Sequence, residues 1–302
     1  MHRYALEHRV SHADVDLLGE VKVAALLGLL EQAAVEASWE CGFDPGWYTA
    51  QRRVWIIRRT RLERTLPLGG GDRVRIATHV LDWRRARSLR AYAVERLGAD
   101  GTAVAAAYAT TDWVYCDMTT GRPASVPEEM RRAFSGEADV TLPRARAIAE
   151  SGAGEPVVLP LVVRPSLLDH VTHVNNAAYA AMLEDGAFEL FAAHGWPVAR
   201  MLDCGGALRM TRIDLEYLDD AVAGDELLVR GWIVSGDDDG VRVDDGGTTT
   251  PTTLAIDDAT GAPRGLRLLQ TIARSDGSRI LRSTSDWLWR RRPAVLGGVP
   301  EA

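Results

Sequence analysis

The sequence predicts an α+β protein made of two copies of one fold, each copy with one long helix and several antiparallel strands. Three observations lead to this prediction. The chain matches itself at a constant offset of 153 residues, each copy contains one long run of helix-forming residues, and strand-like segments separated by turns follow each run. The length of 302 residues agrees, because a domain usually takes about 150 residues.

The internal repeat is the strongest of these observations. Between residues 16–72 and 169–225, 14 of 57 aligned positions are identical, where chance in an alanine-rich chain gives roughly five. The segment between the copies is rich in Gly, Pro, Ser and charge, with one short helix expected near residues 127–134. We therefore predict an N-terminal domain at 1–135, a linker at 136–156 and a C-terminal domain at 157–302.

The elements of the two copies follow the same order. Each long helix is expected to end at a glycine, Gly42 in the first copy and Gly195 in the second, where a left-handed residue closes a helix. The predicted helices are 21–42 and 175–195, and the predicted strands are 54–66, 72–83, 88–97 and 102–116, then 207–218, 225–234 and 264–275. Each copy should thus have about four strands. Residues 235–265, with the acidic run Asp237–Asp239, read as a solvated loop.

Composition and charge restrict the function. The chain has 46% hydrophobic and 25% charged residues, which is typical of soluble globular proteins. Its net charge of −7 argues against nucleic acid or an anionic membrane as a partner. No signal-peptide pattern or long apolar run is present. The three cysteines form neither a metal-binding pair nor a disulfide framework, so we expect a cytoplasmic protein without metal or cofactor.

The two copies differ where chemistry is expected, just before the second helix. Asp169 aligns with Asp16, whereas His173, Asn175 and Asn176 align with Glu20, Lys22 and Val23. A carboxylate, an imidazole and two amides therefore gather at a helix N-terminus in the second copy only. Such an end presents unpaired backbone N–H groups and partial positive charge, which suit a carbonyl oxygen or an anion.

These residues carry a family resemblance. The pattern D-x-x-x-H-V-N-N-x-x-Y, from Asp169 to Tyr179, resembles the hotdog-fold thioesterases. The duplication, together with LLGLLEQAAVEASWECG and VWIIRRTRLE in the first half, resembles the acyl-ACP thioesterases. The resemblance implies two tandem hotdog domains, each a curved antiparallel β-sheet wrapped around a long central α-helix, with the active site in the second. It also implies hydrolysis of an acyl thioester on acyl carrier protein (ACP), releasing a free fatty or polyketide-type acid.

Two positions depart from the pattern of the plant members of this family. Val171 stands where they have Asn, and past Leu215–Tyr217 their Glu and Cys positions hold Asp220 and Ala221. A thiol nucleophile is therefore missing there, and water should attack. We expect Asp220 or Asp169 to activate the water and His173 to orient it or to stabilise developing charge.

The remaining polar residues have structural alternatives to these roles. Backbone N–H groups near Asn176 are expected to bind the oxyanion, and Asn175 and Asn176 are the predicted substrate-binding residues. Both asparagines are also suited to cap the helix. Asp169 is equally suited to cap a turn, as its match in the first copy indicates.

Three functions stay open on the sequence alone: an acyl-ACP thioesterase, an acyl-CoA thioesterase and a non-catalytic acyl-binding protein. A hotdog hydratase is disfavoured, because its Asp-x-Asn-Pro-x-His pattern is absent. An acidic carrier protein would need an arginine patch, for which the sequence offers Arg52–Arg53 and the runs 84–87 and 290–292. A tandem pair can complete the hotdog dimer within one chain, and a homodimer of such pairs is also open.

Overall fold

The computed structural model describes residues 2–134, 147–234 and 265–292. These residues fall into two compact units, the first formed by Met1–Val15 with Glu20–Arg146 and the second by Asp16–Gly19 with Ala147–Ala302. The acidic run at 237–239 and the loop expected around it lie outside the described residues, as does part of the predicted linker.

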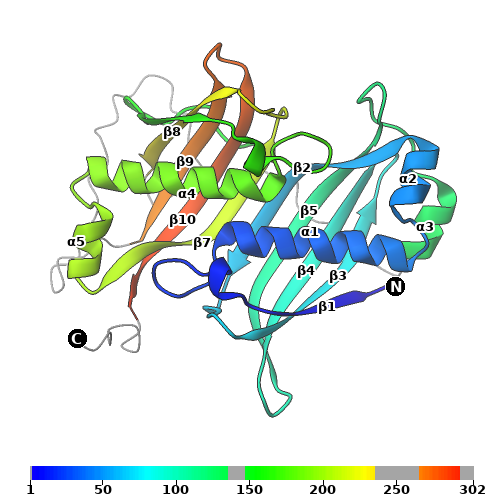
Figure 1. The fold of residues 1–302 in the computed structure, drawn as a ribbon, viewed down its shortest axis with the longest axis horizontal. Helices are drawn as coiled ribbons and strands as arrows, with labels where there is room; N and C mark the ends of the chain where they lie inside the picture. Colours follow the sequence, from blue (N-terminus) through cyan, green and yellow to red (C-terminus); the bar gives the residue numbers. More distant parts are fainter. Residues whose placement is uncertain (1, 135–146, 235–264, 293–302) are drawn as a thin grey trace. The chain divides into compact units, whose positions relative to one another are not determined.

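The first unit is a five-stranded antiparallel sheet with a long helix against it (Figure 1). Its strands lie in the order β1-β3-β4-β5-β2. Its elements are β1 (Tyr4–Arg9), a 3-10 turn (His12–Asp14), α1 (Val23–Glu40), α2 (Pro45–Gln51), β2 (Arg53–Arg64), β3 (Arg73–Trp83), β4 (Arg87–Leu97), β5 (Ala103–Asp117) and α3 (Glu128–Phe134). The predicted helix at 21–42 is confirmed as α1, with Gly42 at φ +86° just beyond its end.

The second unit repeats this architecture strand for strand. Its strands lie in the order β6-β8-β9-β10-β7, all antiparallel. Its elements are β6 (Val157–Val162), a 3-10 turn (Pro165–Leu167), α4 (Asn176–Ala193), α5 (Val198–Asp203), β7 (Gly206–Tyr217), β8 (Glu226–Val234), β9 (Leu266–Arg274) and β10 (Arg279–Arg291). The predicted helix at 175–195 is confirmed as α4, and Gly195 follows it at φ +84°.

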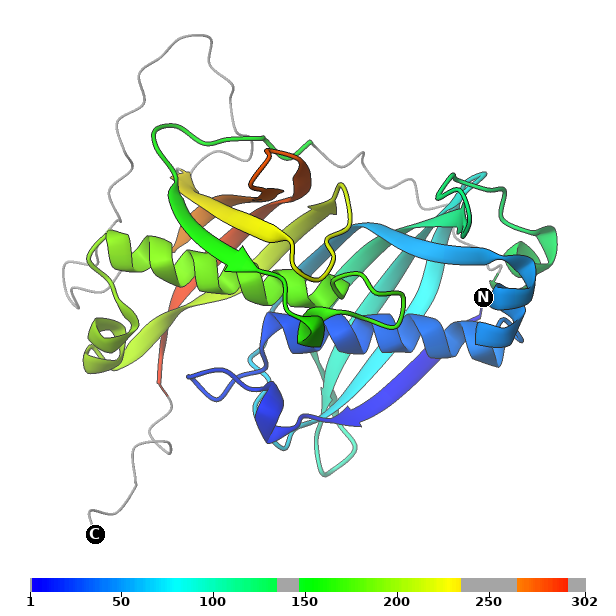
Figure 2. The ribbon, with the colours of Figure 1, turned by 45° about the horizontal axis from the view of Figure 1, so that its top comes forward.

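Each sheet curves around its own long helix (Figure 2). Alternate residues of each strand point to the helix, as the period of two in β3 shows, with Val74 and Ile76 buried and their neighbours more exposed. From α1, Leu30 and Ala37 are buried against this face. Full burial of one such leucine contributes about 2 kcal/mol. One face of each long helix is therefore buried against its sheet.

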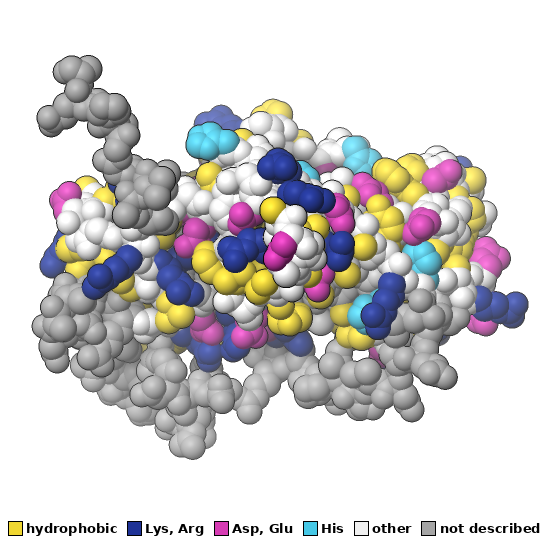
Figure 3. All heavy atoms as spheres, turned by 90° about the horizontal axis from the view of Figure 1, so that it is seen from below, with side chains coloured by type: hydrophobic (Ala, Val, Ile, Leu, Met, Phe, Trp, Pro, Cys, Tyr) yellow, Lys and Arg dark blue, Asp and Glu magenta, His cyan; other side chains and the backbone are white. Residues whose placement is uncertain are grey.

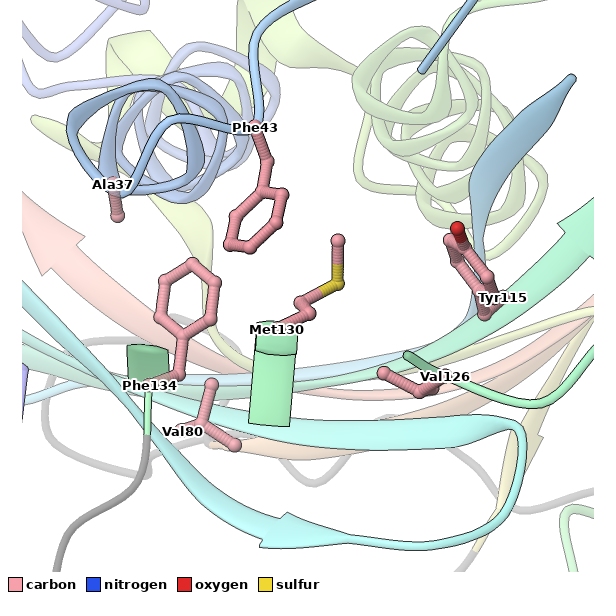
Figure 4. Close-up of a cluster of buried hydrophobic side chains, with 7 residues drawn as sticks. All are labelled: Ala37, Phe43, Val80, Tyr115, Val126, Met130 and Phe134. Carbon is pink, nitrogen blue, oxygen red and sulfur yellow. The ribbon is translucent and has the colours of Figure 1, made fainter. Parts of the chain in front are cut away.

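A cluster of buried side chains closes the first unit at the C-terminal end of α1 (Figure 4). Its members come from α1, α3, the strands and the loops between them: Ala37, Phe43, Val80, Tyr115, Val126, Met130 and Phe134. The short helix predicted near 127–134 is confirmed as α3, and its Met130 and Phe134 are 1% and 3% exposed. This end of the first unit is packed rather than polar.

The sequence predicted about four strands in each copy and located four in the first and three in the second, whereas the described residues of each unit form five. The missing strands are β1 in the first unit and β6 and β10 in the second, and the short helices α2 and α5 were also missed. β1 and β6 are six-residue edge strands, and β6 contains Pro160, which a strand accepts only at an edge or bulge. β10 hides its pattern differently, because its buried row includes Ser283 and Ser285.

Candidate functional site

The candidate site is the loop that leads from β6 into α4 in the second unit. Backbone hydrogen bonds fix it on three sides: Asn175 donates to Leu167 O at 2.9 Å, Val174 to Ala221 O at 2.9 Å, and Asp169 to His173 O at 2.9 Å. Thr172 lies in the left-handed region at φ +68°, a conformation that costs a β-branched residue about 1–2 kcal/mol. The loop is thus held in a strained and specific shape directly before His173.

His173 and Asp220 meet at this loop. Nδ1 of His173 lies 3.3 Å from Oδ2 of Asp220, and the two side chains are 42% and 54% exposed. At this exposure the ion pair adds little stability. Its chemical effect is to orient the ring, because a carboxylate beside Nδ1 favours the proton on that nitrogen and leaves Nε2 as the acceptor. Two residues 47 positions apart in the sequence thus form one acid–base pair.

The Asp169 carboxylate has a different partner. Its Oδ1 accepts a hydrogen bond from the backbone N–H of Val171 at 2.9 Å. The aligned Asp16 does the same in the first copy, accepting from Leu18 N at 2.8 Å. In both copies this aspartate closes the same turn, and the structure brings the carboxylate of Asp220, not that of Asp169, to the imidazole of His173.

The two asparagines lie at the beginning of α4. Asn175 is the N-cap, and its Oδ1 accepts from Ala177 N at 2.8 Å. Asn176 is the first helical residue, and its carbonyl accepts from the Tyr217 hydroxyl at 3.2 Å. Among the hydrogen bonds of the described residues none uses the backbone N–H of Asn176. The asparagine side chain at 175 thus shapes the helix end, and a backbone donor stays available beside it.

Two residues that the sequence analysis gave no role hold the Asp220 turn. The buried hydroxyl of Tyr179 accepts from Ala221 N at 3.1 Å, and burial raises the pKa of this phenol above its ordinary value. Arg274, at the end of β9, donates hydrogen bonds to Asp219, Asp220 and Asp225 of the same turn. Ala221, which stands at the family's cysteine position, is fully buried. The acidic turn YLDDAVAGDE was the signal that could have suggested an arginine partner.

No cysteine thiol lies at the site among the described residues of this unit. Its cysteine, Cys204, is unpaired and follows α5, beyond the opposite end of the 18-residue helix α4 from His173. An 18-residue helix is about 27 Å long. Among the described residues, no group of three or more His, Cys, Asp or Glu side chains is arranged to hold a metal ion. No described helix has the length and apolarity that a membrane crossing needs.

Several arginines proposed as a docking patch already have acidic partners. Arg53 pairs with Asp117 at 2.6 Å, and Arg87 pairs with Asp112. Arg84 is 3.1 Å from an oxygen of Asp82. On the face shown in Figure 3, the described basic and acidic side chains are interspersed rather than gathered by sign.

Comparison with known proteins gives one family. Residues 2–134 match the family model described as the acyl-ACP thioesterase N-terminal domain. No curated protein sequence matches the chain.

Solved structures share the fold over nearly the whole chain. A protein described as an oleoyl thioesterase from Lactobacillus plantarum has a TM-score of 0.73 at 19% identity, covering 96% of this chain and 97% of its own. An acyl-ACP thioesterase from Bacteroides thetaiotaomicron has a TM-score of 0.67 at 17% identity, covering 95% and 98%. The 12:0-ACP thioesterase from Umbellularia californica has a TM-score of 0.69 at 16% identity, covering 95% and 94%. At these identities the likeness shows the fold alone.

Proposed function

Residues 2–134 belong to the acyl-ACP thioesterase family as its N-terminal domain, and we propose that the chain is a thioester hydrolase that releases a free acid from acyl carrier protein. The family resemblance inferred from the sequence is confirmed for this part of the chain. The observation that carries the proposal to the second unit is the His173–Asp220 pair, with a distance of 3.3 Å at the N-terminus of α4. Acyl-CoA is the alternative substrate, since its thioester is chemically the same.

The geometry favours a mechanism in which Asp220 orients the imidazole of His173 and His173 is the general base for the attacking water. With Asp220 at Nδ1, the Nε2 of His173 takes a proton from a water molecule as its oxygen attacks the thioester carbon. The C–S bond then breaks and the thiolate leaves with little acid assistance, because a thiolate, whose conjugate thiol has a pKa of about 8.5, is a weak base. Nε2 returns its proton to the thiolate, so the imidazole ends the cycle unchanged.

The N-terminus of α4 supplies the stabilising charge. The free backbone N–H of Asn176 is the proposed donor to the oxygen that becomes negative in the tetrahedral intermediate, supported by the positive end of the helix dipole. Asn175 contributes to substrate binding only indirectly, by capping the helix that carries this donor. Asp169 acts as the turn-closing residue that sets the position of His173.

The two units are proposed to be tandem hotdog domains, with residues 1–135 and 157–302 as the domains and 136–156 as the linker. The common strand order of the two units and the curvature of each sheet around one helix support this arrangement. A further homodimer stays a prediction. Three unpaired cysteines favour a reducing compartment, which supports a cytoplasmic location.

The direct experiment follows thiol release from a chain-length series of acyl-ACPs and acyl-CoAs. We expect release from at least one acyl-ACP, and a loss of about a hundredfold or more in kcat for His173→Ala. His170→Ala is the matched control, because His170 is an exposed histidine of the same loop. Its kcat should stay within about twofold of the wild type.

The outcomes separate the candidate functions. Faster release from acyl-CoA than from every acyl-ACP favours the CoA alternative. An absence of thiol release from all substrates, with tight binding of the acyl chain, points to the acyl-binding alternative. Equal rates for wild type and His173→Ala would overturn the assignment of the site to the second unit.

A further inference from the structure

We propose that Arg274 is the positioning residue of this site: it holds the turn 219–225 so that the Asp220 carboxylate faces His173. The inference rests on the proposed function, because it concerns the acid–base pair of that reaction. Arg274 is the last residue of β9 and is separated from His173 by about a hundred positions in the sequence. It was predicted neither by the motif nor by the internal repeat.

Three of the four side-chain hydrogen bonds of Arg274 go to one turn, and the fourth runs from its Nη1 to Ser278 Oγ at 3.3 Å. Its Nη1 donates to Asp219 Oδ2 at 2.9 Å and its Nε to Asp225 Oδ2 at 2.9 Å. Its Nη2 donates to the backbone carbonyl of Asp220 itself. The planar guanidinium is suited to this, because it presents donors in a rigid fork to several oxygens at once. One side chain therefore ties the first two residues of the turn and its last residue to the sheet.

Besides this clamp, backbone hydrogen bonds hold the two ends of the turn, because Asp219 N donates to Ile280 O at 3.2 Å and Gly224 N to Val163 O at 3.0 Å, whereas the carbonyl of Asp220 accepts its hydrogen bond from Arg274. The hydrogen bonds of Tyr179 and Val174 both end on Ala221, where they fix the backbone one residue past Asp220. Asp219, Asp220 and Asp225 bring three negative charges to one short turn, and like charges at this spacing repel. Arg274 offsets this repulsion and leaves the Asp220 carboxylate, which it does not bind, pointing to His173.

The first unit offers a matched comparison. Arg274 stands opposite Leu227 in the β8–β9 pair, and Arg96 stands opposite Val74 in the β3–β4 pair. Val74 and Leu227 are 153 residues apart, the offset of the internal repeat. Within the described residues Arg96 makes no ion pair, and Leu66 and Pro67 occupy the positions that correspond to Asp219 and Asp220. The clamp therefore occurs only in the copy that has the acid–base pair.

The test combines Arg274→Gln with Asp220→Asn in a double-mutant cycle, with Arg96→Gln as the control. We expect Arg274→Gln to lower kcat by about tenfold to a hundredfold with KM within about twofold, because a misplaced group costs turnover rather than binding. In the Asp220→Asn background the same substitution should change kcat by less than about twofold. Arg274→Lys should recover part of the loss, since it restores the charge without the fork.

A crystal structure of Arg274→Gln separates this inference from the proposed function. If the wild type proves to be inactive, the proposed function fails, and the distance from His173 Nδ1 to Asp220 Oδ2 still decides the inference. Loss of that contact supports the clamp, and an unchanged contact overturns it. The inference would also be overturned if Arg274→Gln lowered kcat equally in the wild-type and Asp220→Asn backgrounds. It would likewise be overturned if Arg274→Gln had a wild-type melting curve and an unchanged kcat.

Discussion

The loops that precede α1 and α4 share one backbone and differ in their polar groups. Val21 N donates to Leu68 O at 2.8 Å as Val174 N donates to Ala221 O at 2.9 Å. Three further backbone bonds of the first copy have a counterpart in the second. Lys22 N donates to Asp14 O as Asn175 N donates to Leu167 O, and Gly19 N donates to Asp16 O as Thr172 N donates to Asp169 O. Val10 N donates to Asp72 O as Val163 N donates to Asp225 O. The scaffold of the site was therefore kept in both copies.

The two loops differ in the side chains at the positions of Glu20 and His173. Glu20, at the position of His173, lies 3.9 Å from Arg64, and both side chains are largely buried at 12% and 8% exposure. In the second copy the corresponding residues are His173 and Tyr217, and the imidazole faces the carboxylate of Asp220 in place of a guanidinium. The first copy closes its loop with an internal ion pair, whereas the second exposes an acid–base pair to water. The comparison separates residues that build the loop from residues to which the proposed function assigns the reaction.

The largest expected effect that sharpens this comparison is that of Asp220→Asn. The amide keeps the shape of the side chain but removes the charge that orients His173, so we expect kcat to fall by about a hundredfold. Thiol release from acyl-ACP measures it, and Asp203→Asn at the far end of the second unit is the control. Wild-type turnover in Asp220→Asn would assign the orienting role to another group.

An intermediate effect is expected at the shared turn aspartate. Asp16→Ala and Asp169→Ala each remove one hydrogen bond to the backbone, and each should lower the free energy of unfolding by about 1 kcal/mol in urea denaturation. Asp169→Asn keeps an oxygen acceptor at this position. Its unfolding equilibrium constant and its kcat should therefore each stay within about twofold of the wild-type value. A loss of turnover in Asp169→Asn with an intact fold would instead make Asp169 the base.

The smallest effect concerns backbone strain. Gly19 and Thr172 occupy the same left-handed position at φ +77° and +68°. Gly19→Thr should lower the free energy of unfolding by about 1 kcal/mol. Thr172→Gly should raise it by less than that, because the extra freedom of glycine in the unfolded chain offsets part of the gain. Denaturant unfolding measures both changes, and the change in the free energy of unfolding should have opposite signs in the two variants. Changes of the same sign would contradict the structural equivalence of the two loops.

The parts of the fold that could be predicted are those with local signals. The two long helices follow from runs of helix formers that end at Gly42 and Gly195, and the central strands follow from alternating apolar residues between turns. The edge strands β1 and β6 gave no such signal, because they are short and one contains Pro160. β10 was missed because serines take positions in its buried row, so that its apolar alternation is broken.

The site was predictable only as far as the repeat and the motif reach. The comparison of aligned positions singled out His173, because a constant offset places it against Glu20. Asp220 was found through the segment after Tyr217. Its contact with His173, however, depends on how the turn 219–225 is placed against the loop before α4. Arg274 was out of reach, because residues 235–264 are inserted before it and no constant offset connects it to the first copy.

The central claim, that the second loop performs the chemistry and the first does not, is tested most directly by replacing the defining residue of each loop. The measurement is the initial rate of thiol release from acyl-ACP by His173→Glu and by Glu20→Gln, with melting curves to verify folding. We predict that the rate of His173→Glu, which gives the second loop the first loop's residue, falls by about a hundredfold or more while that of Glu20→Gln stays within about twofold of the wild type. Retained turnover in His173→Glu, or an equal loss in both folded variants, would contradict the account.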